Sequence, residues 1–107
     1  MAKVTLWGYV VACDPGCNNM ESYHGSIDTA DIQPDQDLTH IIDNPWWRSS
    51  INYRFSTLTF VELREADALF RYGEREVVVP FGADKAKQLE QVGLSYAYAE
   101  LYVQVEQ

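Results

Sequence analysis

The sequence predicts an α+β fold, mainly an antiparallel β-sheet of about four strands with one or two short helices. Several stretches rich in β-branched and aromatic residues predict the strands, and the last of them, 94–105, alternates strictly between two faces. The helix prediction rests on 83–92, where apolar residues recur at helical spacing and Gly93 stands at the C-cap. In chain order these elements are compatible with a ferredoxin-like βαββαβ arrangement.

The length of the chain favours a single domain spanning 1–107, because 107 residues leave no room for a second core. The hydrophobic content of 47% is sufficient to build one core, and 22% of charged residues without a low-complexity tract argue against an intrinsically disordered chain. No apolar run approaches the roughly 20 residues of a membrane-spanning helix, so we expect no membrane partner.

The first strand is expected at 4–12, a β-branched and aromatic run without a helical period. The run ends at Cys13 much as a lipoprotein signal would, but its interruption by Trp7 and Gly8 and its short basic region favour a strand. The turn signal Asp14-Pro15-Gly16 follows directly.

The polar segment from about 14 to 50 is expected to be a long acidic loop or irregular region. Within it, Leu38, Ile41 and Ile42 have the spacing of one helical face, which predicts a short helix near 35–42.

The second half of the chain contains the clearest strands. We expect 51–63 to be a central strand with one face formed by Tyr53, Phe55, Thr57, Thr59, Val61 and Leu63. The stretch 65–72 is either a helical turn or a return strand, and 76–81 is a strand. The strand 94–105 should lie beside 51–63, with a core face formed by Ala97, Ala99, Leu101, Val103 and Val105.

The net charge of the chain restricts the kinds of molecule that it is expected to bind. The chain carries a net charge of −8, and seven acids but no Lys or Arg lie between Val4 and Trp47. This balance disfavours direct binding to nucleic acid or to an anionic membrane surface, and favours a protein partner with a basic surface. With two cysteines only, a secreted disulfide framework is not indicated, and a cytoplasmic location is expected.

Catalytic and metal-binding patterns are weak. Cys13, Cys17, His24 and His40 suggest a zinc site, but the two histidines are too far apart for the usual spacing, so no metal or cofactor is expected. No nucleophile is paired with a histidine in a recognisable motif, and no phosphate-binding loop is present. We therefore do not expect an enzyme.

Two aromatic groups are candidates for binding. Trp46, Trp47 and Arg48 are residue types typical of binding hot spots, although a Trp pair after a long loop also serves to fix that loop on the core. Tyr96, Tyr98 and Tyr102 share the polar face of 94–105, where they are either covered by the predicted helix or exposed as an adhesive face.

Five acids complete the candidate partner-binding set: Asp28, Asp31, Asp35, Asp37 and Asp43. They either form a solvated loop or imitate the closely spaced charges of DNA and occupy a basic groove built for it. In size and acidity, without a shared motif, the chain resembles the small phage-encoded inhibitors of CRISPR and restriction systems.

This likeness implies a non-enzymatic, anti-CRISPR-like inhibitor of a basic nucleic-acid-handling protein. The alternative is a toxin-neutralising immunity protein or a small assembly subunit, and a small metal-dependent or hydrolytic enzyme comes third. The sequence does not indicate an oligomeric state.

Overall fold

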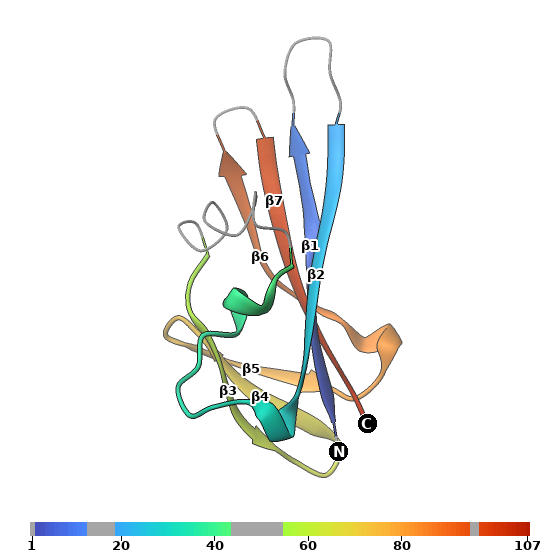
Figure 1. Cartoon of the computed structure of the whole chain (residues 1–107), viewed down its shortest axis with the longest axis vertical. Coiled ribbons are helices and arrows are strands. Elements are labelled where there is room, and N and C mark those ends of the chain that lie inside the picture. Colours follow the sequence, from blue (N-terminus) through green and yellow to red (C-terminus); the bar gives the residue numbers. More distant parts are fainter. Residues whose placement is uncertain (1, 13–18, 44–54, 95–96) are drawn as a thin grey trace.

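The computed structural model describes residues 2–12, 19–43, 55–94 and 97–107 (Figure 1). These residues form strands and short 3-10 turns. Their order is β1 (Lys3–Ala12), β2 (Asn19–Asp28), η1 (Thr29–Asp31), η2 (Leu38–Ile41), β3 (Leu58–Leu63), β4 (Asp67–Tyr72), β5 (Arg75–Pro80), η3 (Ala83–Lys85), β6 (Lys87–Leu94) and β7 (Ala97–Glu106).

The strands form two antiparallel sheets. One has the order β2-β1-β7-β6 and the other the order β3-β4-β5. Figure 1 shows β5 running across the direction of β1, β2 and β7. The two sheets meet where β5 ends: Phe81 makes an isolated parallel bridge to Val105, and the Gly82 N–H donates to the Val105 carbonyl at 2.9 Å.

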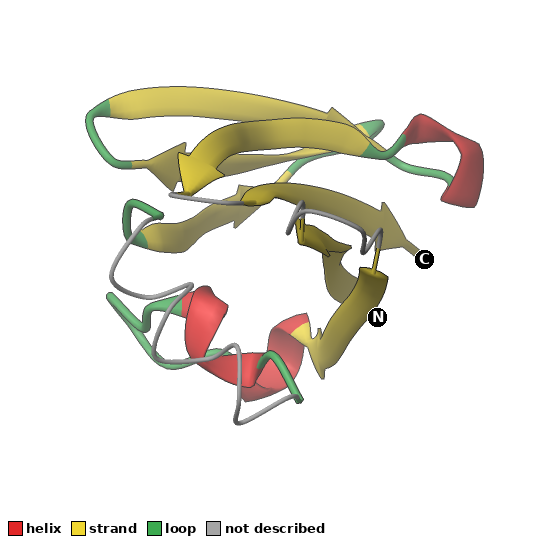
Figure 2. Ribbon diagram, turned by 90° about the horizontal axis from the view of Figure 1, so that it is seen from above, coloured by secondary structure: helices red, strands yellow, loops and turns green. Residues whose placement is uncertain are grey.

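One core lies between the inner faces of the two sheets. Alternate residues point inwards and are buried where β1 and β7 are described, as the period of two in a strand requires: Val4, Leu6, Ala99, Leu101, Val103 and Val105. Leu38 and Ile42, at the start and just after the end of η2, are also fully buried and join the same cluster. Figure 2 shows η1 and η2 close together and η3 on the opposite side of the molecule.

Gly8 in β1 allows a contact across the four-stranded sheet. Tyr23 of β2 is buried, and its hydroxyl donates a hydrogen bond to the backbone carbonyl of Glu100 in β7. A Cβ at position 8 would overlap that carbonyl and crowd the Tyr23 hydroxyl. The absence of a side chain at Gly8 therefore permits β2 to bond to β7 over the intervening strand.

Several sequence predictions agree with the structure. The chain is mainly antiparallel β-structure, strands lie where 4–12 and 76–81 predicted them, and 65–72 contains a return strand, β4. The strand predicted at 94–105 is β7, and Leu101, Val103 and Val105 are buried as expected.

The helix predicted at 83–92 is wrong, and with it the ferredoxin-like arrangement. The prediction of one sheet of about four strands is wrong too, because the described residues form seven strands in two sheets. Only Ala83–Lys85 forms a 3-10 turn, and the rest of the segment belongs to β6, which pairs with β7. A short amphipathic segment fits either a helix or an edge strand, and here pairing with β7 overrides its helical propensity. Gly93 lies within this strand and is not a helix C-cap.

The strand predicted at 51–63 is shorter and differently placed. It spans Leu58–Leu63 and lies at the edge of the three-stranded sheet beside β4, not centrally and not beside β7. A β-bulge between Phe60 and Glu62 breaks the predicted common face, because an extra residue shifts the alternation. Residues 51–54 lie outside the described residues.

The region 14–50 is less irregular than expected. It contains β2, whose inner face carries Tyr23 and Gly25 and therefore lacks a β-branched pattern. The short helix expected near 35–42 is the 3-10 turn η2. No helix among the described residues is long and apolar enough to span a membrane.

Candidate functional site

The five candidate aspartates fall into two structural groups, and Asp37 belongs to the bonded one. Its carboxylate caps η2 by accepting hydrogen bonds from the Thr39 N–H at 3.1 Å and the Thr39 hydroxyl at 2.7 Å. It also accepts from the N–H of Leu58, where β3 begins, at 3.3 Å. The Nε2 atom of His40 lies 3.4 Å away. Asp37 therefore ties the acidic segment to the three-stranded sheet.

Asp43 is bonded in the same way to the free edge of β2. Its N–H donates to the His24 carbonyl at 2.9 Å, and its Oδ1 accepts from the His24 N–H at 3.3 Å. The side chains also meet, with 3.2 Å between His24 Nδ1 and Asp43 Oδ2. Asp43 therefore occupies the edge of β2 at His24 and has a structural role.

The other three aspartates, Asp28, Asp31 and Asp35, form what we call the acidic rim. All three are exposed, and none makes an ion pair within the described part of the chain. Asp28 ends β2, Asp31 ends η1, and Asp35 has a positive φ of 60° in the turn before η2. The rim is therefore a set of unpaired carboxylates within one short segment.

Of the aromatic candidates, only Tyr102 is fully described. Trp46, Trp47, Arg48 and Tyr96 lie outside the described residues, and for Tyr98 the structure gives only its backbone place in β7, opposite Val11 and Gly93.

Tyr102 is half-buried on the outer face of the four-stranded sheet. Its ring stacks on Trp7, with 4.3 Å between centroids and 8° between planes. Tyr9 meets Trp7 edge-on at 5.8 Å. The helix expected to cover this face is a strand of the same sheet, so it cannot cover the tyrosine.

A polar network borders these rings. One carboxylate oxygen of Glu100 accepts hydrogen bonds from the Tyr102 hydroxyl and from Nε2 of Gln88, each at 3.1 Å. Sequence reasoning missed Trp7 and Tyr9 as surface residues. Their alternation with the buried Val4 and Leu6 was the available signal.

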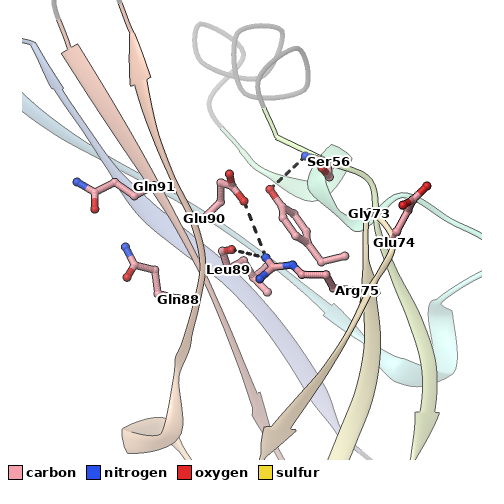
Figure 3. Close-up of a pocket in the computed structure, with 9 residues that line it drawn as sticks. Ser56, Gly73, Glu74, Arg75, Gln88, Leu89, Glu90 and Gln91 are labelled. Atoms are coloured by element: carbon pink, nitrogen blue, oxygen red, sulfur yellow. Dashed lines mark hydrogen bonds and ion pairs between the residues drawn. The ribbon is translucent and has the colours of Figure 1, made fainter.

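A cleft of about 650 Å³ lies between β6 and the turn that joins β4 to β5 (Figure 3). Its described lining residues are Ser56, Tyr72, Gly73, Glu74, Arg75, Gln88, Leu89, Glu90 and Gln91. These come from both sheets, so no sequence pattern could have grouped them.

Arg75 spans this cleft. Its Nη2 atom donates to the Leu89 carbonyl at 3.1 Å and lies 4.0 Å from the Glu90 carboxylate, as Figure 3 shows. The guanidinium also lies over the Tyr72 ring, 5.6 Å from its centroid. The one cation among the described lining residues is thus occupied by partners within the chain.

Tyr72 forms the buried wall of the cleft. Burial raises the pKa of its hydroxyl to about 12, and the nearby Glu90 carboxylate adds to the rise. The Ser56 N–H donates a hydrogen bond to this hydroxyl at 3.1 Å, which lowers its pKa and partly offsets the rise. Tyr72 therefore stays protonated at neutral pH. The described ionisable side chains of the lining are those of Tyr72, Glu74, Arg75 and Glu90.

Within the described ranges, no three His, Cys, Asp or Glu side chains are grouped closely enough to hold a metal ion. His24 and His40 are held by different aspartates, and Cys13 and Cys17 lie outside those ranges.

The three-stranded sheet exposes apolar side chains. Val61, Leu63 and Val78 are 47%, 40% and 37% exposed. A second cleft of about 590 Å³ adjoins Val61 and is bordered by Asp35 and Arg71.

Comparison with known proteins gives no match: no family model fits the sequence, and neither a curated protein nor a solved structure matches it.

Proposed function

We propose that this chain is a cytoplasmic, non-enzymatic binding protein that docks on a basic, nucleic-acid-handling protein and inhibits it. The inhibition would be of the anti-CRISPR or anti-restriction type, with carboxylates taking the place of nucleic-acid phosphates. The observation that carries the proposal is the acidic rim, three exposed aspartates within one short segment that lack a described ionic partner.

The separation of the aspartates into two groups supports this assignment. Asp37 and Asp43 have structural roles, which explains their presence without a partner protein. The rim aspartates have no such role. A chain of net charge −8 gains nothing in folding from adding unpaired carboxylates, because like charges repel in the compact state. Their contribution is to long-range attraction of a basic surface.

The test uses the protein as bait in a lysate of the organism that carries the gene. The wild type is compared with a rim variant, in which Asp28, Asp31 and Asp35 are all replaced by Asn. A matched control replaces three other exposed acids, Glu62→Gln, Glu65→Gln and Asp84→Asn, and therefore changes the net charge equally.

We expect the wild type and the control to retain a basic nucleic-acid-binding protein that the rim variant loses. The retained protein should lose its activity on nucleic acid when the wild-type chain is added. If all three baits retain the same proteins, or none that handles nucleic acid, the proposal is wrong.

A second candidate function, an immunity protein or a small assembly subunit, is favoured by the exposed Val61, Leu63 and Val78. Under this alternative, the three-stranded sheet carries the contact. Val61→Ser would then abolish retention of the partner, whereas the rim variant would leave it unchanged.

A further inference from the structure

The edges of β2, β3 and β6 are contacted by different parts of the chain. Asp43 bonds to the edge of β2 at His24, through its backbone and its side chain, and Asp37 bonds to the first residue of β3. At the edge of β6 the contact comes from the opposite sheet, because the Arg75 side chain reaches the Leu89 carbonyl. Among the described residues, β7 is the only strand that bonds to β6. An unpaired edge is a template for another strand.

Space for such a strand exists beside β6. The cleft of about 650 Å³ runs between this edge and the β4–β5 turn (Figure 3). Leu89 lies at a β-bulge in the pairing with β7, and its carbonyl points away from β7 towards Arg75. Bulged edges are frequent next to binding sites, since they redirect backbone groups.

The charge of the cleft indicates what kind of strand fits. Its described charged groups are Glu74, Glu90 and Arg75, and Arg75 is already held by Glu90 and the Leu89 carbonyl. The lining therefore carries one uncompensated negative charge, within a protein of net charge −8. An acidic strand would be repelled here, whereas Lys or Arg side chains would face Glu74 and Glu90.

We propose that the β6 edge is a docking site for an extended, Lys- or Arg-containing segment of the protein partner, which adds to the four-stranded sheet as a fifth strand. A backbone N–H of the incoming segment replaces the Arg75 guanidinium at the Leu89 carbonyl. Arg75 acts as a removable cover that protects this edge until the partner arrives. This inference rests on the proposed function and adds the form in which the basic partner binds.

The probe is a capped peptide of about eight residues that alternates lysine with threonine, the usual length of a strand and a composition that favours one. Two control peptides accompany it. One has glutamate in place of lysine, and the other keeps lysine but carries N-methyl groups on alternate backbone nitrogens, which blocks strand addition. Each is titrated into the ¹⁵N-labelled protein.

We expect the lysine peptide to shift amide resonances mainly in 73–75 and 88–91, and both control peptides to leave them unchanged. Glu74→Gln with Glu90→Gln should weaken binding about three- to tenfold, as expected for two exposed ion pairs. The matched control, Glu62→Gln with Glu65→Gln, should bind like the wild type. Arg75→Ala should bind the lysine peptide more tightly, because it uncovers the carbonyl and removes a like charge.

The resonance shifts are measured on the wild-type protein, so this test does not depend on whether any variant folds. Equal binding of the N-methylated peptide, or no binding of any peptide, would overturn strand addition. Shifts confined to 28–35 would move the basic segment from β6 to the acidic rim, which refutes this inference and leaves the proposed function standing. Equal shifts with lysine and glutamate peptides would reject the preference for basic partners, on which both proposals depend.

Discussion

The centre of the four-stranded sheet and the segment from Asp28 to Asp43 use their residues in different ways. In β1 and β7 the described inward residues, among them Leu6, Leu101 and Val103, are buried in the core, so packing sets their identity. In the segment 28–43, Asp37 and Asp43 hold the chain in place, while Asp28, Asp31 and Asp35 contact no ionic partner among the described residues. Residues that are needed for the fold can thus be separated from residues whose presence the fold does not explain.

This difference predicts two kinds of mutational effect. Substitutions in the sheet, and at Asp37, should lower stability. Substitutions in the acidic rim should leave stability unchanged and weaken binding to a partner. A loss of stability in rim variants, or unchanged stability in variants of the sheet centre, would contradict this difference.

The largest effect is expected for Leu101→Ala. Leu101 is fully buried in β7, and removing most of its side chain leaves a cavity between the sheets. The free energy of unfolding should fall by about 2–5 kcal/mol. Urea denaturation followed by fluorescence measures this, and an unchanged midpoint would remove Leu101 from the core.

Gly8→Ala should destabilise by about 1–3 kcal/mol, although the change adds a single methyl group. The new Cβ would overlap the Glu100 carbonyl, so the backbone must shift and the bond from Tyr23 must lengthen. The matched control is Gly93→Ala, since a Cβ at Gly93 meets nothing within 4 Å. If the two variants have the same thermal midpoint, the close approach at Gly8 is incorrect.

Asp37→Ala should cost about 1–2 kcal/mol, because it removes the cap of η2 and the bond to the Leu58 N–H. Asp31→Ala is the control within the same segment and should change stability by less than about 0.5 kcal/mol. Thermal unfolding of both variants distinguishes a bonded aspartate from a rim aspartate. A larger loss for Asp31 would reverse the assignment.

A smaller effect should appear at alkaline pH. Burial raises the pKa of both the Tyr23 and the Tyr72 hydroxyl, the latter to about 12. A raised folded-state pKa stabilises the protein fully below the unfolded value of about 10, and this stabilisation is lost as the pH rises from there through the folded value. Unfolding free energies measured across pH 9 to 12 should therefore decline. Tyr72→Phe should decline less steeply than the wild type, and an identical slope would exclude this tyrosine.

The sequence predicts strands correctly where buried apolar residues recur at every second position. β7 was predicted because Leu101, Val103 and Val105 alternate with polar residues, and β5 because of its run of valines. β2 was missed because Gly25 interrupts the apolar alternation of its inner face between Tyr23 and Ile27, at a position where a Cβ would overlap the Ile41 backbone. β6 was mistaken for a helix because one buried residue, Leu89, sits at a bulge that disturbs the alternation.

The candidate site was only partly accessible from sequence. Its acidic residues could be identified, but not which of them are bonded, because the partner of Asp37 at Leu58 is 21 residues away. The cleft at Arg75 could not be predicted either. It depends on the approach of β6 to the β4–β5 turn, and no local pattern records the contact of Arg75 with the Leu89 carbonyl.

We propose that the acidic rim attracts a basic partner without contributing to the fold. The most direct test measures association and dissociation rates with the captured partner at two salt concentrations, for the wild type, the rim variant and the matched charge control. Asn at position 35 also tolerates the positive φ of 60° there, so the rim variant should keep the wild-type stability. We predict a slower, less salt-dependent association for the rim variant alone, with dissociation little changed, since exposed charges act over about 8–10 Å before salt screens them. Equal association rates for the rim variant and the control would contradict the account and reduce the rim to a general solubilising charge.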